Sequence, residues 1–364
     1  MKAALRSAPP AGLETRGPVL TALSSAVRTH LPGPMETRLA DIRAFLESDL
    51  AGIEHDLSRV DHRPTPLHDS AHHLIGLGGK RVRPMCVALA ARAFGVFGPA
   101  ARDLAVAAEL VHSATLLHDD VVDLGDRRRG APTARVLYGN AASVYAGDWL
   151  LVEALMRVRR AGLTDVLDRA LGVLAEMLEA EALQLAARGR VDTTLSDYMR
   201  VVRGKTASLF RWALYAGARA GGASPSECAP LEHFGESIGL AFQVVDDALD
   251  VDGDAEAVGK SLLADLVEGK VTYPLLVAFE RDPSLARVLG DRLAASRASG
   301  ASALDPETAT RAAKAIRDAG GAVEARRLAD SLAADAIAFL AELPDTPART
   351  ALTTIAHAIV TRRS

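Results

Sequence analysis

The sequence predicts an all-α protein, in which long helices form a single bundle around a deep central cavity. Hydrophobic residues make up 49% of the 364 residues and aromatic residues only 4%, and Ala, Leu, Glu and Arg, which favour helices, are abundant. Apolar residues recur every three to four positions along most of the chain. Several of the resulting segments are long and apolar on most sides, which is typical of central helices in a bundle.

The first 35 residues are expected to be a mobile tail outside the bundle. They are rich in proline and glycine and contain no continuous apolar stretch of the signal-peptide type. Their arginines and single acidic residue also fit a transit peptide, although the proline and glycine content argues against the amphipathic helix that such a peptide needs. Residues 36–364 are predicted to form one domain, and Met35 is an alternative start.

A long amphipathic helix is predicted to begin at Glu36, because apolar residues follow it at helical spacing. A break at residues 62–66 and a glycine-rich turn at residues 76–79 come before the next helix, which is expected to begin near Lys80. Pro84 then lies in the first helical turn, where its missing N–H does no harm.

Ten further segments have the helical pattern and are separated by glycine, proline and aspartate. The five longer ones are residues 101–120, 134–160, 164–188, 194–220 and 227–249. The five that follow Pro274 are residues 275–281, 284–297, 306–319, 321–342 and 347–361.

Charge and composition argue against several classes of function. The formal net charge is −4 and no basic stretch is interleaved with aromatic residues, so nucleic acid is not an expected partner. No run of about eighteen apolar residues exists, so at most a peripheral membrane contact is expected. Cys86 and Cys228 lack metal-ligand spacing, and we expect them to be reduced thiols of a cytoplasmic protein.

The stretch from His112 to Asp123 places acidic residues at the end of an apolar segment. In a helix Asp119 and Asp123 lie on one face, where their like charges repel unless a cation binds between them. Carboxylate oxygens without a nearby cysteine suit Mg²⁺ better than Zn²⁺. A solvated helix end that pairs with the arginines at 127–129 explains one such motif equally well.

A second motif of the same kind lies between Phe242 and Asp250 and again follows an apolar segment. Asp246 and Asp250 repeat the spacing of four residues. If the two motifs lie on facing helices, the cavity between them would hold several Mg²⁺ ions. Because Mg²⁺ completes its coordination shell with water and phosphate oxygens, the implied substrate contains a diphosphate.

With these motifs the chain resembles the trans-isoprenyl diphosphate synthases, which make farnesyl, geranylgeranyl and longer polyprenyl diphosphates. The resemblance extends from about Gly78 to Pro274. Its ordered blocks are GGKRVRP at 78–84, the first aspartate motif with RRGAPT at 128–133, GDWL at 147–150, GKT at 204–206, and the second motif with GK at 259–260 and GKVTYP at 269–274. It implies the isoprenoid synthase fold, an orthogonal bundle of long helices with both aspartate motifs at the mouth of the cavity.

The resemblance also implies roles for individual residues. Magnesium ligands are implied at Asp119, Asp123, Asp246 and Asp250, with Asp120 and Asp247 behind them. The allylic diphosphate would be bound by Arg128, Lys205, Thr206, Gln243, Lys260 and Lys270. Isopentenyl diphosphate would be bound by Lys80, Arg83, His112 and Arg129. Catalytic roles are expected for Asp119, Asp123, Asp246 and Lys205.

These roles match the chemistry of prenyl transfer. Breaking the allylic C–O bond leaves negative charge on pyrophosphate, and Mg²⁺ ions and cationic side chains directed at it lower the barrier. Thr206 and Gln243 are expected to direct their dipoles at the carbocation. No arrangement of residues suggests covalent catalysis, and the released diphosphate can accept the final proton. Each basic residue alone would be interpreted as a surface charge, and His112 alone as a core histidine.

Product length is predicted from Ala114 and Thr115, which lie about one turn before Asp119. Farnesyl-making relatives often have a bulky ring at one of these positions, whereas small residues resemble the long-chain polyprenyl synthases. We therefore expect a product longer than C20. A short-chain product remains an alternative, because another helix, near Tyr145, Trp149 or Met156, can form the floor instead.

Two other classes of protein share part of this pattern. A terpene cyclase also ionises an allylic diphosphate, but it has no use for a second diphosphate site at Lys80 and Arg83. A non-catalytic subunit of a heteromeric synthase would be expected to lack motif residues, and none is missing; the departures at Ala131 and Tyr273 remove no ligand. The family commonly forms homodimers, so dimerisation is expected, whereas the allylic primer and the pathway stay open.

Overall fold

The computed structural model describes residues 33–252, 263–299 and 305–362, and nearly all of its regular structure is helical. The N-terminal half contains α2 (Gly33–Ser58), α3 (Pro66–Gly76), α4 (Val82–Phe94), α5 (Pro99–Val122), α6 (Ala134–Tyr138), α7 (Asn140–Arg160) and α8 (Thr164–Ala187). The C-terminal half contains α9 (Leu195–Val202), η1 (Arg203–Ala207), α10 (Ser208–Ala220), η2 (Ser226–Cys228), α11 (Ala229–Asp252), α13 (Ala264–Val267), α14 (Tyr273–Arg281), α15 (Pro283–Ser299), α16 (Pro306–Asp318), α17 (Gly321–Phe339), η3 (Leu340–Glu342) and α18 (Pro347–Thr361).

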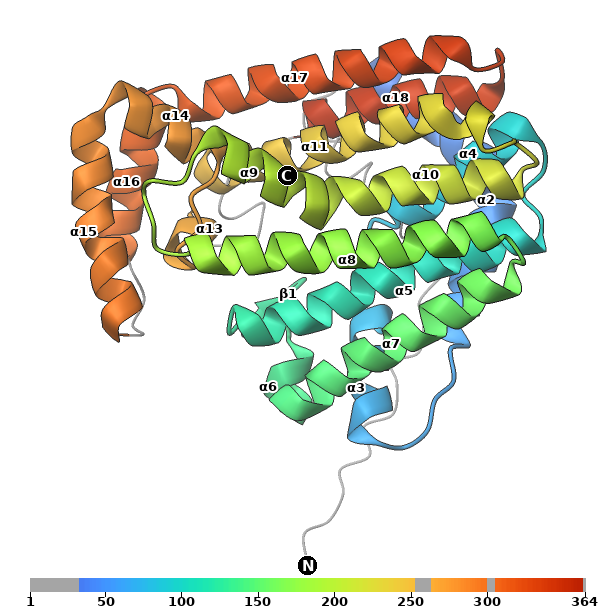
Figure 1. The fold of residues 1–364 in the computed structure, drawn as a ribbon, viewed down its shortest axis with the longest axis horizontal. Coiled ribbons are helices and arrows are strands. Elements are labelled where there is room, and N and C mark those ends of the chain that lie inside the picture. Colours follow the sequence, from blue (N-terminus) through green and yellow to red (C-terminus); the bar gives the residue numbers. More distant parts are fainter. Residues whose placement is uncertain (1–32, 253–262, 300–304, 363–364) are drawn as a thin grey trace, which may run out of the picture.

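The long helices are stacked in rows, and α10 lies in the middle of them (Figure 1). It packs against α4, α5, α8 and α11, while α11 packs against α17 and α5 against α7. Almost every side chain of α4 and α10 is buried, because both helices are apolar on most sides. The expected all-α bundle is therefore confirmed, and no described helix is long and apolar enough to cross a membrane.

Glycines allow these central helices to approach closely. A Cβ atom built on Gly217 of α10 would lie 2.2 Å from the carbonyl oxygen of Val87 in α4. A Cβ on Gly204, in the GKT block, would lie 2.8 Å from the carbonyl oxygen of Glu176 in α8. Neither position tolerates a larger residue without a backbone shift, so Gly204 sets how near Lys205 lies to α8.

The structure modifies several predicted boundaries. The first helix begins at Gly33 rather than Glu36, and residues 1–32 of the expected tail lie outside the described residues. Segment 134–160 is two helices, divided at Gly139 with a φ of 88°. Segment 194–220 contains the π-helical turn η1, which periodicity does not reveal.

The predicted segments do not include helix α3, the strands β1 and β2 or the short helix α13. Helix α3 occupies the interval between the break at 62–66 and the turn at 76–79, and Thr65 caps it by accepting a hydrogen bond from the backbone N–H of His68. A two-residue antiparallel pair, β1 (Arg127–Arg128) with β2 (Ala131–Pro132), closes a short hairpin after α5. This hairpin returns Arg128 and Arg129 toward the end of α5.

Candidate functional site

The two aspartate motifs lie at the ends of α5 and α11, and cationic side chains contact both of them. Asp119 and Asp120 occupy the last turns of α5, and Asp123 is its C-cap. Asp246, Asp247 and Asp250 occupy the last two turns of α11. The loop after α13 brings Lys270 to Asp123, with 2.9 Å between Nζ and Oδ2, and Lys270 lines the same cavity as Asp247 of the second motif.

Lys205 links the first motif to α8. Its Nζ lies 3.4 Å from Oδ2 of Asp119 and 2.5 Å from Oε1 of Glu181, and it donates to Oε1 of Gln184 over 3.3 Å. Burial raises the pKa of Glu181, against the opposing effect of Lys205. Glu181 and Gln184 were not predicted, because α8 contains several other charged residues and nothing in the sequence distinguishes these two from them.

Asp123 is held between two cations, Lys270 and the unpredicted Arg188. Burial alone would raise the pKa of Asp123, but the charges and hydrogen bonds of Lys270 and Arg188 outweigh it and lower the pKa. In the same way burial would lower the pKa of Lys270, but Glu268 and Asp123 raise it. Asp123 is therefore a carboxylate at neutral pH.

Asp120 points away from this group and forms a paired contact with Arg128. The Nε and Nη2 atoms of Arg128 donate to Oδ1 of Asp120 over 3.0 and 2.8 Å. Burial raises the pKa of Asp120, while Arg128 opposes the rise. Asp120 therefore anchors the hairpin that contains Arg128 and Arg129, and its place behind the metal ligands stays a prediction.

Asp246 is paired with an arginine at the other end of the sequence. Nη2 of Arg362, which follows α18, lies 2.7 Å from Oδ1 of Asp246 and also donates to the carbonyl oxygen of Phe242 over 2.7 Å. Its guanidinium stacks 4.1 Å above the ring of Phe242, and only 3% of the side chain is exposed. Sequence reasoning missed Arg362, because a terminal arginine normally indicates a solvated tail.

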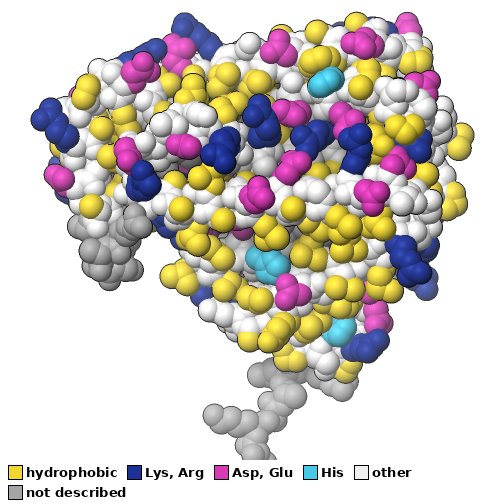
Figure 2. Space-filling view, viewed as in Figure 1, with side chains coloured by type: hydrophobic (Ala, Val, Ile, Leu, Met, Phe, Trp, Pro, Cys, Tyr) yellow, Lys and Arg dark blue, Asp and Glu magenta, His cyan; other side chains and the backbone are white. Residues whose placement is uncertain are grey.

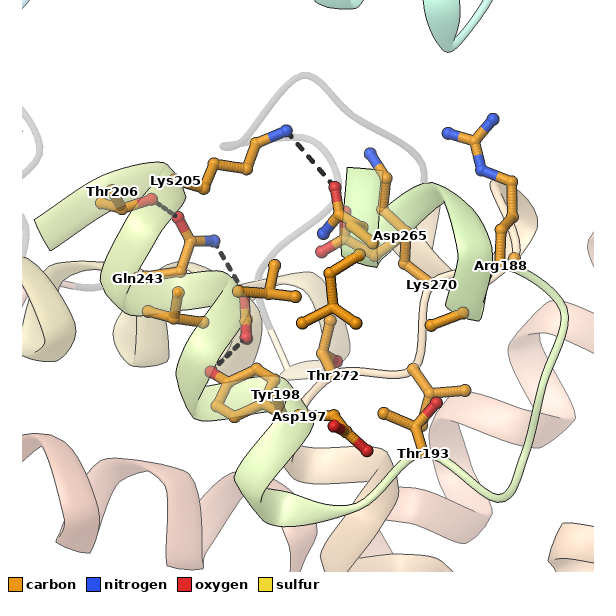
Figure 3. Close-up of a pocket in the computed structure, with 18 residues that line it drawn as sticks. Arg188, Thr193, Asp197, Tyr198, Lys205, Thr206, Gln243, Asp265, Lys270 and Thr272 are labelled. Carbon is orange, nitrogen blue, oxygen red and sulfur yellow. Dashed lines mark hydrogen bonds between the residues drawn. The ribbon is translucent and has the colours of Figure 1, made fainter. Parts of the chain in front are cut away.

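Behind Asp246, a chain of hydrogen bonds connects Thr206 to Asp247 (Figure 3). The hydroxyl of Thr206 donates to Oε1 of Gln243 over 2.9 Å, and Nε2 of Gln243 donates to Oδ1 of Asp247 over 2.9 Å. The hydroxyl of Tyr198 donates to Oδ2 of Asp247 over 2.6 Å. Burial raises the pKa of Asp247 well above its usual range.

The carboxylate of Asp250 accepts hydrogen bonds from the backbone N–H groups of Ala264 and Asp265, over 2.9 and 3.3 Å. It therefore caps the start of α13. A role in metal binding stays a prediction for this residue. Lys260 lies outside the described residues.

The four residues predicted to bind isopentenyl diphosphate also come together. Burial, followed by the charges of Arg83 and Arg129, lowers the pKa of His112 well below its usual range. Burial and Arg362 lower the pKa of Lys80. The guanidinium of Arg129 lies against Gly79, where a Cβ would be 3.0 Å from Nη2.

Arg83 is the most isolated of these cations. Its guanidinium stacks 4.7 Å above the ring of Phe210, and its buried Nε has no hydrogen-bond partner among the described residues. Buried cations that lack an acidic partner are typical of anion sites.

Arg81, in the middle of the same block, has a different role. It adopts a left-handed conformation with a φ of 45° and points into the protein. Its guanidinium lies 2.5 Å from Oε1 of Glu109 in α5 and 2.8 Å from Oε1 of Glu54 in α2. Burial would lower the pKa of Arg81, but Glu109 and Glu54 raise it. Arg81 therefore anchors the turn that presents Lys80 and Arg83.

The residues predicted to control product length are buried to different degrees. Ala114 is fully buried in the apolar core, and Thr115 is half-buried and donates its hydroxyl to the carbonyl oxygen of His112 over 2.8 Å. Of the alternative floor residues, Tyr145 and Met156 are 62% and 54% exposed on the outside of α7. Neither therefore forms the floor of a cavity within this chain.

A cavity of about 100 Å³ lies between α8, α9, η1, α11 and the loop that contains Lys270 (Figure 3). Lys205, Thr206 and Gln243 border it on one side, and Tyr198 and Thr272 on the other. The match to the family model for polyprenyl synthetase covers residues 64–305, which contain this cavity and both aspartate motifs.

The chain belongs to the polyprenyl synthetase family. This polyprenyl synthetase is 38% identical over 329 residues to the octaprenyl diphosphate synthase of Escherichia coli, with 89% of this chain and 99% of that protein covered. Its structure matches a decaprenyl diphosphate synthase from Rhodobacter capsulatus with a TM-score of 0.81 and 33% identity, covering 89% and 99% of the two chains. It also matches a polyprenyl synthase from Caulobacter crescentus, complexed with calcium and isoprenyl diphosphate, with a TM-score of 0.83 and 34% identity over 89% and 97%.

These relatives confirm the expected family and fold. Octaprenyl, nonaprenyl and decaprenyl diphosphate synthases are among these relatives, which supports the expected long-chain class of trans-prenyltransferase. The residues that bind substrates and metal are proposed below.

Proposed function

We propose that this polyprenyl synthetase condenses isopentenyl diphosphate with an allylic diphosphate in a Mg²⁺-dependent reaction and releases a trans-polyprenyl diphosphate. The observation that supports it best is that Lys205 and Lys270, which contact the first aspartate motif, line one cavity with Asp247 of the second motif. Asp119 meets Lys205, Asp123 meets Lys270, and Asp246 meets Arg362. Facing carboxylates and cations of this kind suit a diphosphate bound through metal ions.

The donor set fits Mg²⁺. Asp119, Asp123 and Asp246 offer only carboxylate oxygens, and among the described residues no three acidic, histidine or cysteine side chains lie close enough to enclose an ion. Mg²⁺ suits such a site, because it is usually held by one or two carboxylates and completes its shell with water and substrate phosphate. When bound, the ions would neutralise the charge that develops on the leaving pyrophosphate.

Allylic ionisation also needs cations that bind the leaving group and dipoles that stabilise the carbocation, and side chains of the protein supply both. Lys205 and Lys270 would exchange their present carboxylate partners for diphosphate oxygens. Because both ammonium groups are mostly buried, their attraction to the leaving group is stronger than it would be in water. Thr206 and Gln243 would direct oxygen dipoles toward the allylic carbocation.

Isopentenyl diphosphate would bind at the separate cationic group of Lys80, Arg83, His112 and Arg129. Its double bond attacks the allylic cation and forms the new C–C bond. Loss of one proton to the released diphosphate then completes the product, so no side chain has to act as a general base. Arg128 forms an ion pair with Asp120, so we propose only a peripheral contact between Arg128 and the allylic diphosphate.

This assignment is tested by incubating the purified protein with Mg²⁺, isopentenyl diphosphate and an allylic diphosphate, followed by mass analysis of the dephosphorylated products. We expect a Mg²⁺-dependent ladder that ends beyond C20. Farnesyl or geranylgeranyl diphosphate as the sole end product would contradict the chain length. A cyclic hydrocarbon formed without isopentenyl diphosphate would contradict the reaction itself, and absence of any turnover would favour a non-catalytic subunit.

Homodimerisation is part of the proposal. Large apolar side chains are exposed on α6, α7 and α8, and hydrophobic patches are visible over α7 and α8 in Figure 2. They include Val136, Leu137, Tyr145, Val152, Met156, Leu171, Leu178 and Leu185. Exposed apolar area of this extent supports an interface with a second copy. Light scattering should give twice the mass of the chain, and Leu178→Glu should give the monomer.

A cytoplasmic location is also proposed. Cys86 and Cys228 are both buried free thiols rather than a disulfide. Burial raises the pKa of Cys86 to about 12, so this thiol is unreactive. Labelling under native conditions should modify neither cysteine, whereas labelling after unfolding should modify both.

A further inference from the structure

We infer that Arg188 is a further residue of the allylic diphosphate site, where its guanidinium binds the diphosphate beside Lys270. The inference rests on the proposed function and adds to it a residue that belongs to none of the motif blocks. Arg188 is the C-cap of α8, and its Nη2 donates to Oδ1 of Asp123. The other oxygen of the same carboxylate, Oδ2, accepts from Nζ of Lys270 over 2.9 Å.

Arg188 lines the cavity between α8 and α11 together with Lys205 and Lys270. Figure 3 shows the cationic ends of these three side chains along one edge of the cavity, with Asp197 and Tyr198 at the opposite edge. Lys205 and Lys270 are already proposed to bind the allylic diphosphate. Arg188 therefore extends the same row of cations by one member.

Arg188 has fewer acidic partners than the two lysines. Lys205 contacts Glu181 in addition to the first motif, and Lys270 contacts Glu268 in addition to the first motif. In the part of the chain that the structure describes, Asp123 is the single acidic partner of Arg188. A cation with one carboxylate partner loses least when it exchanges that partner for a phosphate oxygen.

The guanidinium of Arg188 also has unused hydrogen-bond donors. Its buried Nε has no hydrogen-bond partner among the described residues. A buried donor without a partner costs free energy, so a ligand that brings several acceptor oxygens is favoured there. A diphosphate brings such oxygens, and the planar fork of a guanidinium binds phosphate through two parallel hydrogen bonds.

The loop that contains Lys270 fixes the position of Arg188. The backbone N–H of Gly189 donates to the carbonyl oxygen of Gly269 over 2.7 Å. Gly269 has a φ of 81°, and a Cβ built on it would lie 3.0 Å from Cγ of Arg188. These contacts hold the stem of Arg188 against the residue that precedes Lys270, so both cations can bind one diphosphate.

The expected contribution of Arg188 follows from its exposure. When the allylic C–O bond breaks, its electron pair goes to the pyrophosphate, and a nearby guanidinium stabilises the added charge. The side chain of Arg188 is 28% exposed, so water screens part of this attraction. We therefore expect a contribution to affinity of about tenfold, below that of a fully buried charged hydrogen bond.

Arg190 offers a matched control. It lies two residues after Arg188, and its Nε and Nη2 donate to the carboxylate of Asp192, both over 2.9 Å. Both side chains of this pair are more than half exposed, and Arg190 is not among the residues that line the cavity. Arg190→Met therefore removes the same charge from the same loop, away from the proposed diphosphate.

The experiment measures the binding of inorganic pyrophosphate by isothermal titration calorimetry in the presence of Mg²⁺, and the KM for both substrates. We expect Arg188→Met to raise the Kd for pyrophosphate and the KM for the allylic diphosphate about tenfold, with the KM for isopentenyl diphosphate within about twofold of the wild type. Arg188→Lys keeps the charge without the fork, so its Kd should rise only about threefold. Arg190→Met should match the wild type in all three quantities.

Two other roles for Arg188 give different results. If Arg188 only stabilises the fold, Arg188→Met lowers Tm and leaves the Kd for pyrophosphate equal to that of Arg190→Met. If Arg188 only competes with metal for Asp123, Arg188→Met binds Mg²⁺ more tightly in a titration without pyrophosphate, and the Kd for pyrophosphate is again unchanged. Either result would overturn the inference.

Affinity measured apart from turnover separates this inference from the proposed function. A wild type that binds pyrophosphate but forms no product would overturn the proposed function, while the Kd of the variants still decides whether Arg188 binds the anion. An active wild type with an unchanged Kd in Arg188→Met would overturn the inference alone. A wild type that neither binds pyrophosphate nor turns over would overturn both.

Discussion

The buried ion pair between Arg81 and Glu109 should contribute strongly to the free energy of unfolding. Both side chains are 3% exposed, and their closest atoms are 2.5 Å apart. Removal of one partner of a buried ion pair costs about 3–5 kcal/mol, because the other charge stays buried without compensation. Glu54 still contacts Arg81 in a Glu109→Gln variant, so we expect the low end, about 3 kcal/mol.

The matched control is Glu54→Gln. Glu54 contacts the same guanidinium over 2.8 Å, but its side chain is 30% exposed, so solvent compensates part of the loss. We expect a cost of about 1 kcal/mol for this variant. The two variants remove the same charge from the same arginine and differ mainly in burial.

Thermal unfolding followed by circular dichroism measures both variants. About 3 kcal/mol corresponds to a fall in Tm of about 4 °C for a chain of this size. Because Arg81 anchors the turn that presents Lys80 and Arg83, the KM for isopentenyl diphosphate should also rise, by about fivefold, with little change in kcat. A Tm for Glu109→Gln equal to or above that of Glu54→Gln would contradict the larger stabilising contribution expected from the buried partner.

Three further outcomes are expected. Hydrogen bonds from Arg219, against a smaller effect of burial, lower the pKa of Asp165 to about 2. The stability from this pair is therefore present above the unfolded pKa of about 4 and is lost as the pH falls toward 2, so Arg219→Met should lower Tm at pH 7 by an amount that disappears near pH 2. Ala114→Phe should shorten the product, as mass analysis will show, and lower stability by about 1–3 kcal/mol because Ala114 is fully buried. Asp119→Asn, like removal of Mg²⁺ with a chelator, should reduce kcat at least about a hundredfold without lowering Tm by more than a few degrees, and restored activity on addition of Mg²⁺ distinguishes metal loss from unfolding.

The sequence was most informative where one short segment contains a complete chemical pattern. The repeated spacing of Asp119 with Asp123 and of Asp246 with Asp250 predicts carboxylates on one face of each helix, and the structure has them there. Helical periodicity likewise predicts the central helices, because a buried helix has to be apolar over its whole length.

The sequence was least informative where a contact joins segments far apart in the chain. Arg362 and Asp246 are separated by more than a hundred positions, and nothing near either residue indicates the other. Glu181 and Tyr198 were missed for the same reason: each is an ordinary polar residue in its own helix and becomes part of the site only when η1 and α11 pack beside it.

The pairing of Arg362 with Asp246 affects how the protein should be handled in the laboratory. The end of α18 lies beside the second aspartate motif, so any sequence fused after residue 364 begins only two residues from a side chain that contacts the site. A polyhistidine tag there would bring metal-binding imidazoles next to carboxylates that are proposed to bind metal. Activity and metal-binding measurements should therefore use protein without a tag after residue 364, with any affinity tag at the N-terminal end.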